Sequence, residues 1–156
     1  MARQKVRHNS EHDAPVPGFS QAVKVRAEGT LVFISGLLAR RHIGNADYPW
    51  YESVLREEDA KVEHQGDIEG QARQAFEAIK TIVAFEGGSL DDVVRIVIYL
   101  TDMNLYPPVA RVRREYFGDE PPASTCVQVA RLYDTRQLIE VEATAMIPDS
   151  PRGAVG

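Results

Sequence analysis

The sequence lacks the features that define several protein classes. It has a single cysteine, Cys126, so no disulfide can form within the chain, and we expect a reducing, cytoplasmic location. Its longest apolar run, Leu31 to Leu38, has the length of a strand and falls far short of the ~20 residues that span a bilayer. The charged N-terminus has no apolar segment behind it, so we expect neither a secretory signal nor a membrane association.

Basic residues are also fewer than acidic residues. The 23 acidic and 18 basic residues leave a net charge of −5, and an acidic domain repels a phosphate backbone. Arg111, Arg113 and Arg114 cluster, but such a group is typical of a solvated helix face, so no nucleic-acid partner is expected. The four histidines are scattered and there is no glycine-rich phosphate loop. We therefore expect neither a metal ion nor a cofactor.

What remains is an ordinary globular chain. The 156 residues are 44% apolar and 26% charged, which suits one domain with its own core. We expect a flexible N-terminal tail over residues 1–14, a single domain over 15–148 and a flexible C-terminal tail over 149–156.

Apolar periodicity predicts the order β-β-α-β-α-β-β, an α+β fold with two helices on one face of a mixed sheet. The first two strands should form a hairpin. The predicted strands are Ser20–Ala27, Thr30–Gly36, Asp92–Leu100, Ala123–Arg131 and Leu138–Ile147, and the predicted helices are Asp67–Glu86 and Pro107–Phe117. Residues 39–66 show no clear period, and loops of that length are usually functional or locally structured.

The last strand alternates strictly, with Glu140, Glu142 and Thr144 opposite its apolar residues. If the last two strands form a hairpin, the sheet has a second, polar face with carboxylates, hydroxyls and the thiol of Cys126. Such a face fits either an ordinary exposed surface or a site at a subunit junction, and periodicity does not choose between them.

Glu140 is the best candidate for a general acid or base. A carboxylate with apolar neighbours along its strand is partly desolvated, and desolvation raises its pKa toward neutrality. The alternative is an ion pair with an arginine across a subunit interface. Cys126 fits a small buried side chain better than a nucleophile.

Several segments resemble the RidA/YjgF (Rid) family of small trimeric proteins. They are Pro17-Gly18-Phe19-Ser20-Gln21-Ala22, Phe33-Ile34-Ser35-Gly36, QARQAFEAIKTIVAFEGGSLDDVVRIVIYLTDM, ASTCVQVARL and IEVEATAMIP, within a match from Pro17 to Pro148. The resemblance implies a chorismate-mutase-like fold and a homotrimer with three clefts between subunits. Better-known members hydrolyse reactive enamines and imines, such as 2-aminoacrylate, to 2-oxo acids and ammonia.

The resemblance also implies roles for individual residues. Glu140 matches the glutamate that positions the attacking water, and Gly36 and Cys126 match residues whose backbone amides bind the substrate. The chain departs from the pattern where the family's carboxylate-binding arginine becomes Ser124 and its tyrosine becomes Phe19.

A third departure is Ala110, which stands where the family has an asparagine. We therefore expect a cleft for a larger, less anionic or differently oriented ligand. Arg40 and Arg41 follow the second predicted strand and are candidates to reach that cleft, although both also fit an ordinary surface.

Three functions follow in order of preference. The first is a hydrolytic deaminase of enamine or imine metabolites with an altered cleft. The alternative is a trimer that binds a small metabolite in clefts between its subunits without chemistry. A ribonuclease ranks last, because the chain is acidic and has no evident pair of acid and base histidines.

Overall fold

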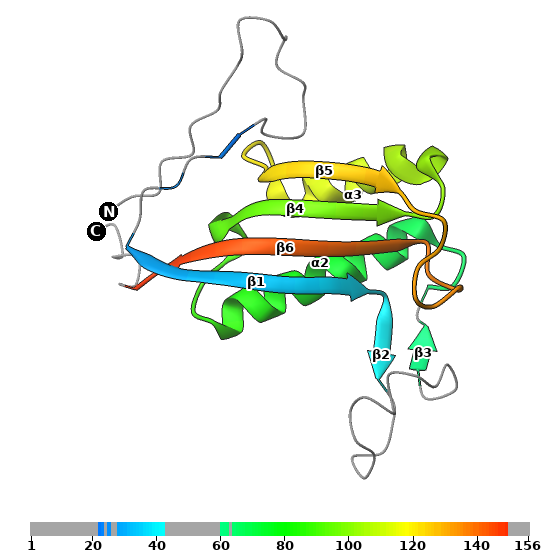
Figure 1. Ribbon diagram of the computed structural model, residues 1–156, viewed down its shortest axis with the longest axis horizontal. Coiled ribbons are helices and arrows are strands. Elements are labelled where there is room, and N and C mark those ends of the chain that lie inside the picture. Colours follow the sequence, from blue (N-terminus) through cyan, green and yellow to red (C-terminus); the bar gives the residue numbers. More distant parts are fainter. Residues whose placement is uncertain (1–21, 24, 26–27, 43–59, 63, 150–156) are drawn as a thin grey trace, which may run out of the picture.

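A four-stranded mixed sheet forms the centre of the molecule (Figure 1). The computed structural model describes residues 22–23, 25, 28–42, 60–62 and 64–149, without the side chains of 40–42, 60 and 61. The sheet has the strand order β1-β6-β4-β5, with bounds β1 (Gly29–Leu38), β4 (Val93–Leu100), β5 (Ala123–Gln128) and β6 (Ile139–Pro148). A separate small ladder joins β2 (Arg40–His42) to β3 (Ala60–Val62).

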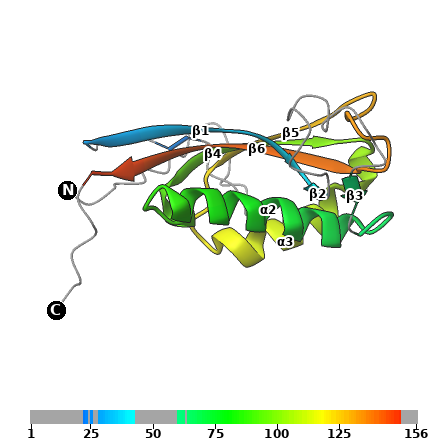
Figure 2. The same cartoon turned by 90° about the horizontal axis from the view of Figure 1, so that it is seen from below.

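Both helices lie on one face of this sheet (Figure 2). They are α2 (Ile68–Phe85) and α3 (Tyr106–Phe117), and each is next to a short 3-10 turn, η2 (Leu90–Asp92) or η3 (Met103–Leu105). β6 pairs antiparallel with β1 and β4, while β4 pairs parallel with β5 across the connection that contains α3. The predicted α+β fold with two helices on one face is confirmed.

The last two strands do not form the hairpin on which the hypothesis of a polar face with Cys126 was conditional. β4 lies between β5 and β6, so these two strands do not form a hairpin. β5 follows α3 and therefore joins β4 as a parallel neighbour, as strand–helix–strand units do, and β6 then inserts between β1 and β4.

The first predicted strand, Ser20–Ala27, falls mostly outside the described residues. Its described members, Ala22, Val23 and Val25, are not in a strand. The predicted N-terminal tail and residues 150–156 also lie outside the description, as do residues 43–59 of the segment without a clear period.

The core lies between the sheet and the helices. The apolar side of β6 is buried along its whole length, through Ile139, Val141, Ala143, Ala145 and Ile147. The buried side of α2, with Ala72, Ala75, Phe76, Ile79 and Val83, packs on it, and Phe76 lies edge-on against Phe117 of α3 with ring centroids 5.8 Å apart. This packing leaves the opposite side of β6, with Glu140 and Glu142, free of the helices (Figure 2).

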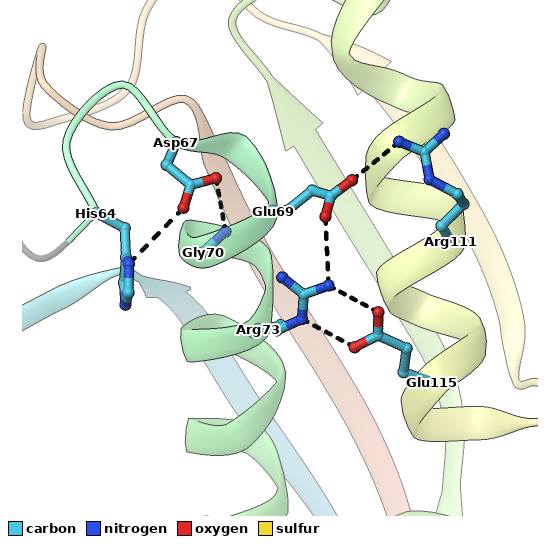
Figure 3. Close-up of polar contacts among 7 residues, drawn as sticks. All are labelled: His64, Asp67, Glu69, Gly70, Arg73, Arg111 and Glu115. Atoms are coloured by element: carbon cyan, nitrogen blue, oxygen red, sulfur yellow. Dashed lines mark hydrogen bonds and ion pairs between the residues drawn. The ribbon is translucent and has the colours of Figure 1, made fainter.

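Asp67 caps the start of α2. Its Oδ1 accepts a hydrogen bond from the backbone N–H of Gly70 at 3.0 Å, and the second carboxylate oxygen lies 3.8 Å from His64 Nδ1 (Figure 3). Gly87, just beyond the end of α2, has the positive φ of 82° that suits glycine.

An exposed chain of ion pairs joins the two helices (Figure 3). Arg73 of α2 donates to both carboxylate oxygens of Glu115 at 2.9 and 2.8 Å and to Glu69 at 3.3 Å. Arg111 of α3 donates to the other oxygen of Glu69 at 2.9 Å. Exposed pairs contribute little singly, so this network orients α3 against α2 more than it stabilises the fold.

Candidate active site

The free face of the sheet brings Glu140 against the backbone of Gly36. Between the pairs Ile34–Ala143 and Leu37–Val141 the register of β1 slips, which gives a bulge that contains Gly36. A Cβ atom on Gly36 would lie 1.8 Å from Glu140 Oε1. Only glycine therefore leaves the carboxylate in this position, and two of the residues that the family resemblance singled out, Gly36 and Glu140, lie side by side.

The environment of Glu140 makes its carboxyl group a weaker acid than an ordinary glutamate. Glu140 is half-buried, and burial raises its pKa above the ordinary value, with a further rise from the negative charge of Glu142. This is the direction that the apolar flanks predicted. Glu142 itself is held by Arg95 of β4 at 3.2 Å.

Tyr99 of β4 is the cross-strand neighbour of Glu140 on the same face. Its pKa is raised, first by burial and then by the nearby Glu142. The phenol therefore stays protonated at neutral pH, and it provides a hydroxyl next to a carboxylate. This face also carries exposed apolar side chains, Leu31, Phe33 and Val127.

Ser124 and Cys126 lie on the other face of the sheet. Their partners in β4 are the core residues Ile96 and Ile98, so their side chains point toward the helices. Burial raises the pKa of the Cys126 thiol, which the positive charge of Arg113 partly offsets. The side chains of Ser124 and Cys126 are thus separated from Glu140, and the thiol is not activated as a nucleophile.

Arg113 corrects one sequence-based expectation. Arg111 and Arg114 are exposed and paired with carboxylates, as a solvated helix face requires. Arg113 instead is only 4% exposed, and its Nη1 donates to Ser124 Oγ at 3.0 Å. Its guanidinium carbon also lies 5.9 Å from the centre of the Tyr106 ring.

The spacing of Arg113 along α3 predicts this burial, although its place among three neighbouring arginines favoured an exposed position. Arg113 stands four residues after Val109 and four before Phe117, both of which are buried. Residues four apart share one helix face, so Arg113 belongs to the apolar stripe of α3.

The remaining candidates are placed only in part. Phe19 lies outside the described residues. Arg40 and Arg41 form β2, whose backbone is described and whose side chains are not. The chain enters β2 through Ala39, whose backbone N–H and C=O pair with the buried amide of Gln137 at 3.2 and 2.9 Å. β2 therefore starts at the same end of the sheet as Glu140.

Two functional features are absent from the described part of the chain. Within residues 22–149, apart from the gaps given above, no group of three or more His, Cys, Asp or Glu side chains is arranged to hold a metal ion. The described helices include none with the length and apolar character of a membrane span.

The fold and the site together define a small α+β protein with a carboxylate on the free face of a mixed sheet. The family model described as Endoribonuclease L-PSP matches residues 11–147. The chain belongs to this family, the RidA/YjgF (Rid) family.

Similar proteins extend over most of the chain. A RutC family protein of Pyrococcus horikoshii is 37% identical over 131 residues, which are 84% of this chain and 88% of that protein. The 3-aminoacrylate deaminase RutC of Acinetobacter baylyi is 42% identical over 91 residues, 58% of this chain and 71% of that protein. The crystal structure of the Rid-family protein of unknown function YyfB from Yersinia pestis has a TM-score of 0.71 and 28% identity, and it covers 94% of this chain and 100% of its own.

Proposed function

We propose that the chain is a hydrolytic deaminase of enamine or imine metabolites, with Glu140 as the general base and acid. The observation that carries this proposal is the half-buried Glu140 carboxylate, held on the free face against Gly36. The similarity to a protein named 3-aminoacrylate deaminase, though over part of the chain, supports the same chemistry.

The reaction needs one group that takes a proton and then returns it. After the enamine tautomerises to the imine, water adds to the carbon of the C=N bond, and Glu140 accepts one proton of that water and passes it to the imine nitrogen, which gives a carbinolamine. Glu140 then accepts the hydroxyl proton of the carbinolamine and passes it to the same nitrogen as the C–N bond breaks, which yields a carbonyl compound and ammonia. A carboxylate with a raised pKa serves both steps, because efficient acid–base catalysis needs a pKa near the working pH.

We further propose that the free face packs against other copies of the chain in a homotrimer, with small-molecule clefts between subunits. Phe33 is 78% exposed in the single chain and Leu31 is 46% exposed. Large apolar side chains grouped on one face are typical of an interface. Analytical ultracentrifugation should show a trimer, and Phe33→Glu should dissociate it. A Leu31→Glu/Phe33→Glu variant that stays trimeric would place the interface elsewhere.

The single cysteine supports a reducing, cytoplasmic location.

The test is ammonia release from imines that an amino-acid oxidase generates in the assay. Glu140→Gln should lower the turnover rate by at least 100-fold, within the range that acid–base groups contribute. Glu142→Gln is the matched control, since it removes a carboxylate from the same strand and face, and it should keep most of the activity.

The outcome separates the three functions considered. A native chain that binds 2-oxo acids but does not accelerate ammonia release would be a metabolite-binding protein. The ribonuclease function implied by the family description has less support. His64 is the one histidine whose side chain the structure describes, and it lies beside Asp67 at the start of α2, away from the free face.

A further inference from the structure

Gln137 is a buried polar side chain in the loop that leads into β6, three residues before Glu140. The residue is 0% exposed, and both polar atoms of its side chain pair with one residue, Ala39. Oε1 accepts a hydrogen bond from the backbone N–H of Ala39 at 3.2 Å, and Nε2 donates to the backbone C=O of Ala39 at 2.9 Å. These two bonds satisfy an amide that is otherwise unfavourable to bury.

The two bonds take the place of the next rung of the β1–β6 ladder. The ladder ends at the pair of Leu38 with Glu140, and Ala39 follows directly. A primary amide has the donor and the acceptor of a peptide group, so Gln137 pairs with Ala39 as a neighbouring strand would. Beyond Ala39 the chain turns away from the sheet into β2 (Figure 1). Gln137 therefore holds the point at which the chain leaves β6.

The contact between Gly36 and Glu140 depends on this end of β1. The bulge that contains Gly36 interrupts the ladder, and only two pairs, those of Leu37 and Leu38, lie between the bulge and Ala39. Short strand ends next to an interruption open easily, because few hydrogen bonds hold them. The pairing at Ala39 closes this short end and keeps Gly36 in place beside the carboxylate.

A second buried amide fixes Gln137 itself. Gln71 of α2 is also 0% exposed. Its Oε1 accepts a hydrogen bond from the backbone N–H of Leu138 at 2.7 Å, and its Nε2 donates to the backbone C=O of Arg136 at 3.2 Å. These are the two residues on either side of Gln137. The loop that carries Gln137 is therefore held by a helix that packs on the sheet.

We propose that Gln137 is a positioning residue for the reaction: its pairing with Ala39 keeps Gly36 against Glu140 and so sets the place of the carboxylate. This inference rests on the proposed deaminase function and deepens it. Gln137 acts through the end of β1 and takes no part in proton transfer. A purely structural role would change stability alone, whereas a positioning role also changes the properties of Glu140.

The test compares Gln137→Met with Val83→Ala. Methionine keeps the length of the side chain without its donor and acceptor. Val83 is the matched control because it is buried beside Ile147, seven residues along β6 from Glu140. Loss of a buried hydrogen bond and truncation of a core side chain both destabilise a fold, so both variants should unfold at lower urea concentration. Only Gln137→Met should also lose turnover, by roughly 10–100-fold, because its carboxylate is misplaced.

The titration of Glu140 gives a second readout that needs no turnover. Carbon-13 NMR of the glutamate carboxyls measures its pKa in each variant, with the signal assigned by Glu140→Gln. Burial raises this pKa in the native chain. Gln137→Met should lower it toward the ordinary value of a glutamate, because the carboxylate gains water, and Val83→Ala should leave it unchanged. Both variants retain the charged and titratable groups that the structure describes beside Glu140 on the free face: Glu142, Tyr99 and Arg95.

A double variant tests whether Gln137 acts through Gly36. Gly36→Ala displaces the Glu140 carboxylate directly. If Gln137 acts through the same contact, the addition of Gln137→Met to Gly36→Ala should lower turnover by no more than about twofold. Two losses that multiply would show that Gln137 acts by another route and would overturn the proposal.

Two further results would overturn it. One is a folded Gln137→Met variant with native turnover and a native Glu140 pKa. The other is an equal loss of turnover in Val83→Ala, which would make lower stability the whole cause.

Gln137→Asn replaces Gln137→Met if the latter does not fold. Its amide is one methylene shorter and cannot reach both backbone groups of Ala39, so turnover and the Glu140 pKa should fall in the same direction by less. Native values of both would overturn the proposal. A native chain that releases no ammonia would refute the proposed catalysis alone, provided that the Glu140 pKa still falls in Gln137→Met or Gln137→Asn and not in Val83→Ala.

Discussion

Replacement of Gly36 by alanine is the most direct perturbation of the proposed catalytic geometry. The new Cβ would lie 1.8 Å from Oε1, 2.6 Å from Cδ and 2.9 Å from Cγ of Glu140. Ordinary contact begins at 3.4 Å, so the carboxylate has to move by about 1.6 Å. All three atoms belong to the end of a flexible side chain, so Glu140 and not the sheet should yield.

The effects on stability and on activity should therefore differ. An off-rotamer side chain costs about 1 kcal/mol, and the loss of backbone freedom in the unfolded state offsets this by roughly 0.4–1 kcal/mol. Gly36 has no left-handed φ to strain the alanine. The free energy of unfolding should change by less than about 1 kcal/mol, whereas a 1 Å misplacement of a reacting group can lower the rate by roughly 100-fold.

The assay compares ammonia release and urea unfolding for Gly36→Ala and for Ser35→Ala, its exposed neighbour in the same strand. Gly36→Ala should unfold near the native midpoint and lose about two orders of magnitude in turnover. Ser35→Ala should match the native chain in both. A Gly36→Ala variant with native turnover would refute the role of the Glu140 position. Unfolding at a much lower urea concentration would mean that β1 is displaced instead of the Glu140 side chain.

Two further predictions concern charge. The activity should fall as the pH drops through a pKa that is higher than the ordinary value of a glutamate, because the base form of Glu140 is the one that accepts the proton of water. Glu142→Gln should move this midpoint of the pH–rate profile to lower pH, since it removes a negative charge that raises the pKa; an unmoved midpoint would assign the titration to another group. Ser124→Arg should destabilise the chain by about 2 kcal/mol in thermal unfolding, because it places a second cation against Arg113; a native melting temperature with stronger carboxylate binding would contradict this.

The periodicity of single elements is what made the fold predictable from sequence. Alternation along Ile139–Pro148 identified the buried side of β6, and apolar periodicity identified the helix α2. Strand order is a non-local property, so nothing in β5 or β6 alone shows that β4 lies between them. The sequence therefore could not exclude a hairpin between the last two strands.

The candidate site was predictable only as a set of residues and not as an arrangement. Glu140 was identifiable from its apolar flanks, but its contact with Gly36 depends on a bulge that shifts the register of β1. The hypothesis that the thiol of Cys126 shares the polar face of Glu140 was conditional on direct pairing of the last two strands. Once β4 separates them, the same alternation puts the two side chains on two faces.

Arg113 shows that a cation can lie beside a strand position at which the strand itself has none. A guanidinium has a long, flexible stem, so its charged end is less tied to one backbone position than a small side chain would be. Here the strand supplies a serine, the helix supplies the cation, and the 3.0 Å hydrogen bond between them puts the charge next to β5. A comparison of aligned positions registers this as a lost arginine and predicts a less anionic ligand. The three-dimensional arrangement adds what that comparison misses, because a guanidinium of the neighbouring helix lies within hydrogen-bond distance of the serine.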